Sequence, residues 1–522
     1  MLALGYSRSY SREHNKGSRR FRGTMHARVV HSRGIGERGE SVERDVADDE
    51  AANLDRAVNG LCSSSPEFSA FGPLVPWQRR ALLCVPSVLL VFAMLAATGD
   101  GGVFAIGIAS FITLPFLVIV LIRLAAIWNL AAPSSRRLSP APRLAAADLP
   151  DYTVLVPLLR ESEIVPALVQ SMNALDYPQD RLEILFVTEA AENATRLALS
   201  ICGLPPHMHI LSVPVGTPQT KPRALSYAMQ YATGSLVTVF DAEDVPAPDQ
   251  LRRAAEIFAD CGPDLACVQA RLSIYNADSG FLTRQFALEY AALFEAILPL
   301  MQRLGLPILL GGTSNHFRRT ALDAAGGWDP YNVTEDADLG VRFARLGRRV
   351  VMLDSDTWEE APATLRDWLG QRTRWLKGWM QTYIVHMRSP KRLWRELGSW
   401  RFLGLQAVLG GMILSALVHP WFYVAAFYQV SLGRPLMAGG NLWMLCWFNL
   451  WAGYGAGIVL GLISAWRSQG RVPVLSALLV PIYWLAISFA SYLAIWHFYV
   501  RPYHWQKTPH AARPVTSAAL VP

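Results

Sequence analysis

Long apolar segments occur toward both ends of the chain, and a region of shorter apolar runs lies between them. Residues 81–98 and 103–130 are each apolar over about 20 residues, the length that crosses a bilayer as a helix. Three more apolar segments follow at residues 403–430, 441–466 and 473–500. This pattern predicts a polytopic membrane protein in which a helical hairpin precedes a separate domain and a second membrane region follows it.

Basic residues flank the first pair of apolar segments. Arg79 and Arg80 precede the pair, and Arg136 and Arg137 follow it. Because cationic residues favour the cytosolic side of a membrane, both ends of the hairpin are expected in the cytosol, together with the domain that follows. Arg123, inside the second segment, is expected to extend its guanidinium to the membrane interface.

The region between the membrane segments predicts alternating strands and helices. Four short apolar runs read as buried strands, at residues 152–157, 182–187, 209–213 and 236–240, and helical patterns separate them. Alternation at this spacing is typical of an α/β fold, an open parallel sheet with helices on both faces. In such folds ligands bind at the carboxyl ends of the strands.

The remaining segments are polar or amphipathic. The N-terminal tail lacks the apolar core of a signal peptide and is expected to be disordered. Residues 386–402 mix arginines with tryptophans, which favours an interfacial helix over an ordinary surface helix. Three simple spans would place the basic C-terminal tail outside, although Pro420 and Pro481 could each break a segment.

These patterns divide the chain as follows: a disordered cytosolic tail at 1–75, a membrane hairpin at 76–132, a cytosolic α/β domain at 150–385, an interfacial helix at 386–402, a membrane region at 403–500 and a cytosolic tail at 501–522.

The composition supports membrane insertion and argues against nucleic-acid binding. Hydrophobic residues make up 52% of the 522 residues and charged residues 17%, whereas soluble proteins carry about 25% charged residues. The net charge of +7 is small for this length, and no dense basic stripe occurs. The six cysteines have no metal-ligand spacing, so neither disulfides nor structural zinc is expected.

Three carboxylates directly follow the strand predicted at residues 236–240: Asp241, Glu243 and Asp244. Such residues are unfavourable in a core, and their oxygens are the ligands that hard divalent cations prefer. A bound Mg²⁺ or Mn²⁺ would neutralise a nucleotide-sugar diphosphate and stabilise it as a leaving group. The alternative interpretation of the tetrapeptide is a solvated turn.

A second acidic pair, Glu335 and Asp336, follows Thr334 at the start of a predicted helix. The simplest interpretation is a helix cap, with Thr334 as N-cap and the two acids favoured by the helix dipole. A carboxylate held at this position could also serve as the general base that deprotonates an acceptor hydroxyl.

A third motif, Gln371-Arg-Thr-Arg374-Trp375, combines cations with an aromatic ring. Arginine can pair with phosphate oxygens in bidentate fashion, and tryptophan offers a flat face for stacking on a sugar ring. The alternative is a basic helix that faces the membrane surface.

In this order and spacing, the three motifs resemble those of the membrane-bound family 2 glycosyltransferases, which include the cellulose synthases and bacterial exopolysaccharide synthases. The resemblance covers about residues 75–510, and four further stretches carry it, at residues 156–161, 221–225, 311–317 and 503–510. It implies a GT-A-type (Rossmann-like) glycosyltransferase domain inserted between transmembrane helices, in a bacterial inner-membrane protein.

The resemblance also assigns roles to individual residues. The donor-binding residues that it implies are Pro157, Glu161, Glu189, Lys221, Arg223 and Arg374. Asp241 and Glu243 match the metal motif, with Asp244 as a substitute ligand, and Asp336 matches the catalytic base beside Glu335. The acceptor-binding residues that it implies are Gly312, Thr313, Ser314, Asn315, His316, Gln371 and Trp375.

The implied reaction is inverting and processive, in which UDP-glucose is polymerised into a β-glucan or related exopolysaccharide that is also translocated. The expected partners are the donor, the growing glycan, the lipid bilayer and an accessory secretion subunit. Glutamates stand at 189 and 243 where the family has aspartates, which leaves the donor sugar open. A non-processive transferase acting on a lipid or lipid-linked sugar is one alternative, and a non-catalytic membrane scaffold or sensor is another.

Overall fold

The computed structural model describes residues 39–72, 74–84, 102–131, 143–431, 433, 440–467 and 472–505. The chain divides into two units, residues 1–49 and residues 50–522. The first unit contributes only the start of one helix to the described residues, and the second holds everything discussed below. Most of the first predicted membrane segment, residues 81–98, lies outside the described residues, as does most of the predicted C-terminal tail.

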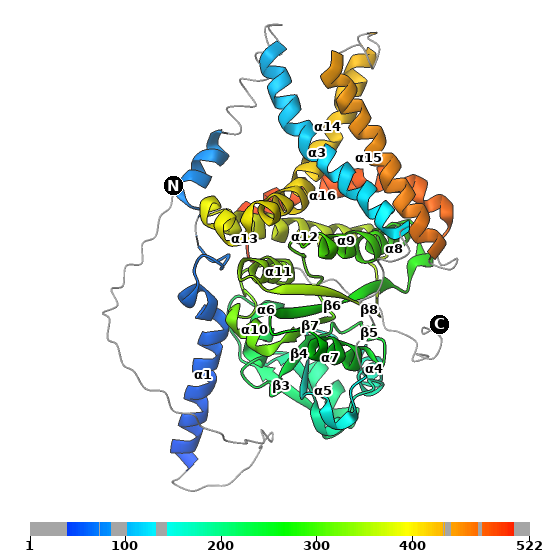
Figure 1. Ribbon diagram of the computed structural model, residues 1–522. Coiled ribbons are helices and arrows are strands. Elements are labelled where there is room, and N and C mark those ends of the chain that lie inside the picture. Colours follow the sequence, from blue (N-terminus) through cyan, green and yellow to red (C-terminus); the bar gives the residue numbers. More distant parts are fainter. Residues whose placement is uncertain are drawn as a thin grey trace. The chain divides into compact units, whose positions relative to one another are not determined.

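An eight-stranded sheet forms the centre of the domain (Figure 1). Strands β1 (Tyr152–Leu158), β2 (Leu182–Glu189), β3 (Met208–Val213) and β4 (Leu236–Val239) are parallel and lie in the order β3-β2-β1-β4. They coincide with the four predicted strands. Their apolar runs are continuous because both faces of the sheet are covered.

The other half of the sheet is mixed, so the expectation of a wholly parallel sheet was wrong. Strand β7 (Asn315–Arg318) is antiparallel to both β4 and β6 (Leu265–Ile274), while β8 (Arg349–Glu359) is parallel to β6, and β5 (Val245–Pro246) is antiparallel to β8. The chain enters β7 at the edge where β4 ends, and it therefore runs the opposite way. The end of β4 and the start of β7 are thus brought together.

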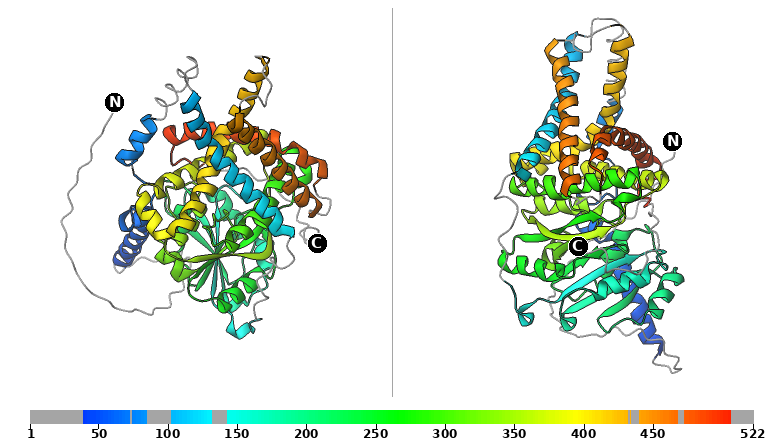
Figure 2. Two further views of the ribbon diagram at one scale, coloured as in Figure 1. Left: turned by 45° about the horizontal axis from the view of Figure 1, so that its top comes forward. Right: turned by 90° about the vertical axis from the view of Figure 1, so that its right-hand side faces the viewer.

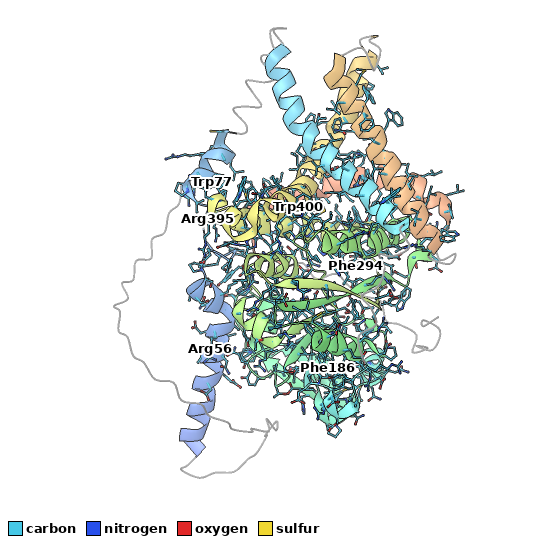
Figure 3. The ribbon with its side chains drawn as sticks, in the orientation of Figure 1. Arg56, Trp77, Phe186, Phe294, Arg395 and Trp400 are labelled. Carbon is cyan, nitrogen blue, oxygen red and sulfur yellow. The ribbon has the colours of Figure 1, made fainter. Side chains whose placement is uncertain are left out.

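Helices cover the sheet on two sides. They include α4 (Val165–Asn173), α5 (Asn193–Ile201), α6 (Lys221–Ala228), α7 (Gln250–Asp260), α10 (Arg319–Ala324) and α11 (Glu335–Arg345). Adjacent residues of one strand enter different cores: Val154 packs in one apolar cluster and Leu155 in another. Phe186, labelled in Figure 3, lies in the same cluster as Val154.

The predicted N-terminal disorder was wrong for part of the tail, because residues 39–64 form helix α1 (Gly39–Ser64). Its apolar residues Leu54, Ala57 and Leu61 recur at helical spacing, and Ala57 and Leu61 are buried. Side chains of the α1 surface also bond the domain, since Arg56 Nη1 donates to Gln230 Oε1 at 2.8 Å. The helix thus docks through a narrow apolar stripe.

Four helices lie between the sheet and the apolar helices: α8 (Phe281–Ala291), α9 (Leu298–Arg303), α12 (Leu365–His386) and α13 (Pro390–Leu405) (Figures 1 and 2). Helix α13 corresponds to the predicted interfacial helix and bends at Gly398, whose φ is 72°. Its Trp394 and Trp400 are exposed. The interfacial position of α13 stays a prediction.

The apolar helices are α3 (Gly102–Ala131), α14 (Gly411–Ser431), α15 (Gly440–Arg467) and α16 (Val480–Val500). By length and composition, three stretches of the described helices can cross a membrane, at residues 390–424, 447–467 and 474–500. Pro420 lies inside α14 without ending it. Pro481 lies in the first turn of α16, where its missing N–H is tolerated, and α16 packs on both α12 and α14.

Candidate active site

A cavity of about 450 Å³ extends from the carboxyl ends of β1, β2 and β4 to the space between α3, α14, α15 and α16. Its lining includes five of the six predicted donor-binding residues: Pro157, Glu161, Glu189, Lys221 and Arg374. Asp241, Glu243, Asp336, Gln371 and Trp375 line it as well. One continuous space therefore joins the edge of the sheet to the apolar helices.

Lys221 connects the two segments that meet at the edge of the sheet. It is the first residue of α6, and its ammonium forms an ion pair with Asp241, just after β4. It also donates to the Gly312 carbonyl at 2.8 Å, in the loop before β7. The pKa of Lys221 is raised by Asp241, Glu335 and Asp336 against the opposing effect of burial. Lys221 thus holds its charge between both acidic motifs.

Asp244 is buried behind the cavity rather than in its wall. Its Oδ2 accepts from the Asp241 backbone N–H at 2.7 Å and from the Thr313 hydroxyl. Its Oδ1 has no hydrogen-bond partner. Burial, followed by the charges of Asp241 and Glu243, raises its pKa well above the usual value. Asp244 therefore fixes the turn that aims Asp241 into the cavity.

Glu359, at the end of β8, is a site residue that the sequence analysis missed. It lines the cavity beside Glu360, and burial together with the charges of Asp244, Glu243 and Asp241 raises its pKa well above the usual value. A signal was present, because Glu359 and Glu360 stand together where β8 ends, as three acids do after β4. Four carboxyl groups thus surround one lysine at this end of the cavity, and the charges of Asp241 and Glu243 disfavour ionisation of Asp244 and Glu359.

The chemistry of these carboxylates fits a divalent cation, although they do not converge on one point. Among the described residues, no group of three or more His, Cys, Asp or Glu side chains has an arrangement that could hold a metal ion as it stands. The metal-binding role of Asp241, Glu243 and Asp244 stays a prediction. Oxygen ligands, mutual repulsion and the unpartnered Asp244 Oδ1 all favour a cation at this place.

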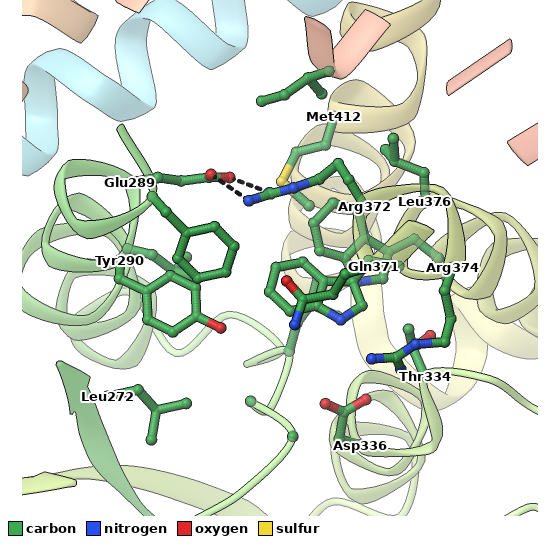
Figure 4. A pocket seen from close by; sticks show the side chains of 18 of the residues that line it. Leu272, Glu289, Tyr290, Thr334, Asp336, Gln371, Arg372, Arg374, Leu376 and Met412 are labelled. Atoms are coloured by element: carbon green, nitrogen blue, oxygen red, sulfur yellow. Dashed lines mark hydrogen bonds and ion pairs between the residues drawn. The ribbon is translucent and has the colours of Figure 1, made fainter. Parts of the chain in front are cut away.

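Asp336 lies at the start of α11 and faces the cavity. Its Oδ1 accepts from the Ala337 backbone N–H at 2.8 Å, and its carboxylate and the Arg374 guanidinium point toward one another (Figure 4). Burial raises the pKa of Asp336, and burial with the charge of Asp336 raises the pKa of Glu335 to about 7. A carboxylate with a raised pKa in a cavity has the properties of a general base.

Thr334 occupies the N-cap position of α11, as predicted, but it does not cap the helix through its side chain. Its side chain makes no capping hydrogen bond to α11. It packs instead beneath Gly378 of α12, where an added Cβ would lie 2.4 Å from the Thr334 hydroxyl oxygen. This close approach of α11 to α12 places Asp336 beside the third motif.

The third motif lies on the face of α12 that borders the cavity. The Trp375 ring stacks on Tyr290 of α8, with centroids 6.2 Å apart and planes 26° apart. The Gln371 Oε1 is buried without a partner. Arg372, which lies between Gln371 and Trp375 in the sequence, extends toward Glu289 and pairs with both of its carboxylate oxygens at 2.7 and 2.8 Å (Figure 4). Its guanidinium also donates to the Tyr483 hydroxyl of α16 at 2.9 Å.

Arg223, a predicted donor-binding residue, is fully buried and does not line the cavity. Its Nη2 bonds both carboxylate oxygens of Glu189, at 2.7 and 2.6 Å. Glu189 does line the cavity. Arg223 is therefore a positioning residue that fixes the Glu189 carboxylate at the end of β2.

Three predicted acceptor-binding residues also lie elsewhere. Ser314, Asn315 and His316 are buried, whereas Gly312 and Thr313 line the cavity. The difference arises because β7 begins at Asn315 and its side chains enter the core. His316 bonds Tyr152 and Gln250, and burial lowers its pKa to about 3.

The membrane arm of the cavity, by which we mean its part between α3, α14, α15 and α16, was not anticipated. Arg123, which was expected at the membrane interface, lines this arm. The His419 side chain has a hydrogen-bond partner within the arm, since its Nε2 lies 2.6 Å from the Tyr454 hydroxyl. Periodicity alone cannot identify such residues, because each helix is apolar on all sides.

Comparison with known proteins gives one family and several relatives. Residues 150–378 match the family model described as "Glycosyltransferase like family 2". Beta-monoglucosyldiacylglycerol synthase of Synechocystis sp. is 29% identical over 268 residues, which is 50% of this chain and 55% of the relative. Glucomannan 4-beta-mannosyltransferase 2 of Arabidopsis thaliana is 29% identical over 276 residues, 49% of this chain and 50% of that one.

The aligned part thus spans about half the length of both relatives. Among solved structures, the mannosyltransferase PcManGT from Pyrobaculum calidifontis, in complex with GDP-Man and Mn²⁺, superposes with a TM-score of 0.51 at 20% identity. The superposition covers 76% of this chain and 99% of that one. At 20% sequence identity, this structural similarity shows a shared fold and nothing more specific.

Removal of the Arg223 side chain tests its positioning role. Arg223→Met should destabilise the domain by about 3–5 kcal/mol, because Glu189 then keeps a buried carboxylate without its partner. The double variant Arg223→Met/Glu189→Leu should recover most of this loss, since no buried charge remains. Thermal unfolding of the solubilised protein measures both, and an equal loss in the single and double variants would contradict the pairing.

Proposed function

Residues 150–378 match the family model of the glycosyltransferase-like family 2, and from this premise we propose that the chain transfers a hexose from a nucleoside diphosphate sugar to a hydroxyl of a membrane-borne acceptor. The observation that carries the proposal is the single cavity, which begins at acidic residues on the edge of the sheet and ends between apolar helices. A donor from water and an acceptor from the membrane can meet in such a space.

The donor end would hold the diphosphate. Asp241 and Glu243 would bind a Mg²⁺ or Mn²⁺ ion, with Asp244 and Glu359 behind them. When bound, the cation offsets the charge of the diphosphate and stabilises it as a leaving group. Lys221 and Arg374, whose charges both act on Asp336, contribute positive charges at the same end. Glu189, held by Arg223, limits the space available to the nucleoside.

Asp336 would act as the base in a single inverting displacement. The acceptor oxygen attacks the anomeric carbon, its proton passes to the Asp336 carboxylate, and the bond to the diphosphate oxygen breaks on the opposite face. Trp375 and Tyr290 form an aromatic wall on which a sugar ring can stack. The unpartnered Gln371 Oε1 can accept a hydrogen bond from a hydroxyl of the same sugar.

The acceptor that this geometry supports best is a lipid or lipid-linked sugar, with UDP-glucose as the proposed donor. The membrane arm is lined largely by apolar side chains such as Ile119, Met412 and Leu450. Acyl chains match such walls, whereas a glycan would leave hydroxyls unpaired along them. The name of the Synechocystis relative, a glucosyldiacylglycerol synthase, agrees with this choice.

Processive synthesis of a β-glucan is the second candidate. The aromatic wall of Trp375 and Tyr290 at the entrance to the arm favours it, because stacked rings suit a sugar chain. The relative from Arabidopsis is named for glucomannan, a polysaccharide. If the chain is such a synthase, the glycan product would cross the membrane between the apolar helices, and an accessory subunit would receive it.

The size of the product distinguishes these two candidates. Membranes supplied with radiolabelled UDP-glucose and Mn²⁺ should yield a small labelled product that partitions into organic solvent. High-molecular-weight, glucanase-sensitive material would instead establish the second candidate. Absence of any metal-dependent product with UDP-glucose, GDP-mannose or other nucleotide sugars would overturn the proposed activity.

Asp336→Asn should lower the transfer rate by about 10²–10⁴-fold, because the acceptor proton loses its base. Binding of the nucleotide and metal should persist, since Asp336 lies on the acceptor side. The matched control is Asp354→Asn, which alters an exposed carboxylate of β8 that pairs with Arg271. Turnover assays measure the transfer rate, and nucleotide-binding isotherms measure donor affinity in the same variants. Near-normal turnover in Asp336→Asn would exclude Asp336 as the base.

Transfer should fall as the pH is lowered toward the raised pKa of Asp336. Burial raises the pKa of Glu335 to about 7 and that of Asp336 above its usual value, so protons occupy the pair under acidic conditions and the base form is lost. Glu335→Gln removes the neighbouring negative charge and should move the acidic limb of kcat/KM to lower pH. A limb that moves to higher pH in this variant would contradict the coupling.

A further inference from the structure

The membrane arm contains a cation without an anionic partner. Arg123 of α3 lines the arm beside Gly453 of α15 and Trp484 of α16. Its guanidinium carbon lies 4.2 Å from the centroid of the Trp484 ring, and Nη1 donates one long hydrogen bond of 3.5 Å to the Gly453 carbonyl. In the described part of the chain, no carboxylate forms an ion pair with Arg123.

The carboxylate on the cavity wall between this arm and the active site is already occupied. Glu289 bonds Arg372 through both oxygens, and its Oε2 also accepts from the Tyr483 hydroxyl at 2.8 Å. Glu289 therefore forms its direct ion pair with Arg372, whereas Arg123 feels the charge of Glu289 only from a distance. The membrane arm carries a net positive charge among apolar helices, where an ionised side chain indicates a functional site.

Two buried amide oxygens that line the same cavity lack hydrogen-bond donors. Asn449 of α15 is buried in the arm; its Nδ2 donates to the Thr113 carbonyl at 2.9 Å, but its Oδ1 has no partner. The Oε1 of Gln371 is unpartnered nearer to Asp336. Both oxygens can accept hydrogen bonds from hydroxyl groups. The cavity thus offers a cation for an anion and acceptors for hydroxyls.

We propose that Arg123 binds the phosphate of a membrane lipid whose headgroup also carries free hydroxyls, and that this lipid is the acceptor. In water-poor surroundings a guanidinium forms strong bidentate bonds to phosphate. The acyl chains lie along the apolar walls, and the headgroup hydroxyls extend past Gln371 toward Asp336. A base at Asp336 requires a hydroxyl acceptor, so the phosphate and the reacting group are separate parts of the headgroup.

Two sources share this chemistry, a glycerophospholipid with free hydroxyls and a sugar linked to a polyprenyl diphosphate. The role of this lipid as the acceptor rests on the proposed transferase function, whereas the binding of its phosphate at Arg123 does not. A neutral diacylglycerol, which has a hydroxyl but no phosphate, is the contrasting ligand.

Native mass spectrometry of the full chain tests the binding site directly. The protein is titrated with phosphatidylglycerol, with a polyprenyl diphosphate-linked sugar and with diacylglycerol. Arg123→Gln should weaken binding of one or both phosphate lipids by about 10- to 100-fold, as expected for loss of a charge-assisted hydrogen bond. Arg123→Lys should retain most of the affinity. Arg253→Gln, an exposed arginine on α7 of the α/β domain, is the control and should leave it unchanged.

The results distinguish a failure of the proposed binding site from a failure of the proposed function. The lipid whose affinity depends on Arg123 identifies the source of the phosphate. Equal affinities of wild type and Arg123→Gln for both phosphate lipids, or diacylglycerol binding as tightly as either of them, would overturn the proposal. Acceptor KM for that lipid should rise in Arg123→Gln while nucleotide binding stays constant. A wild-type protein that binds the lipid through Arg123 but transfers no sugar would refute the proposed function alone.

Discussion

The bonds of Arg372 to Glu289 and Tyr483 join the catalytic domain to the membrane helices, and the geometry of the cavity depends on them. Arg372 is buried on α12, Glu289 belongs to α8, and Tyr483 belongs to α16. A buried ion pair of this kind adds little net stability, because desolvation opposes the attraction. Its consequence here is positional, since it fixes the rotation of α12, whose Gln371, Arg374 and Trp375 line the same cavity as Asp336.

The cavity that results has opposite electrostatic character at its two ends. The carboxyl groups of Asp241, Glu243 and Glu359 make the donor end acidic, and burial with the charges of its neighbours raises the pKa of Glu359 there. Arg123 makes the membrane end positive, among apolar side chains that screen charge poorly. A cation with a nucleotide sugar suits the first end, and an anionic lipid headgroup suits the second. Asp336 lies between them, where donor and acceptor would meet.

Sequence could predict those parts of the structure that follow from local pattern. The strands β1 to β4 were found because a run buried on both faces is continuously apolar, and the motif residues followed them directly. Tertiary contacts determined the rest: the direction of β7, the docking of α1, and the burial of Arg223 and His316. Glu359 and Arg123 were missed as site residues because a strand of 11 residues and an all-apolar helix do not reveal which side faces a cavity.

The most direct test of a single cavity shared by donor and acceptor is a cryo-electron microscopy map of the protein in lipid nanodiscs with UDP and Mn²⁺. The account predicts density for a metal-bound diphosphate between Asp241, Lys221 and Arg374. It also predicts elongated density in the membrane arm that is continuous with this site and contacts Arg123. A diphosphate bound elsewhere, or a protein wall that separates the arm from Asp336, would contradict the account.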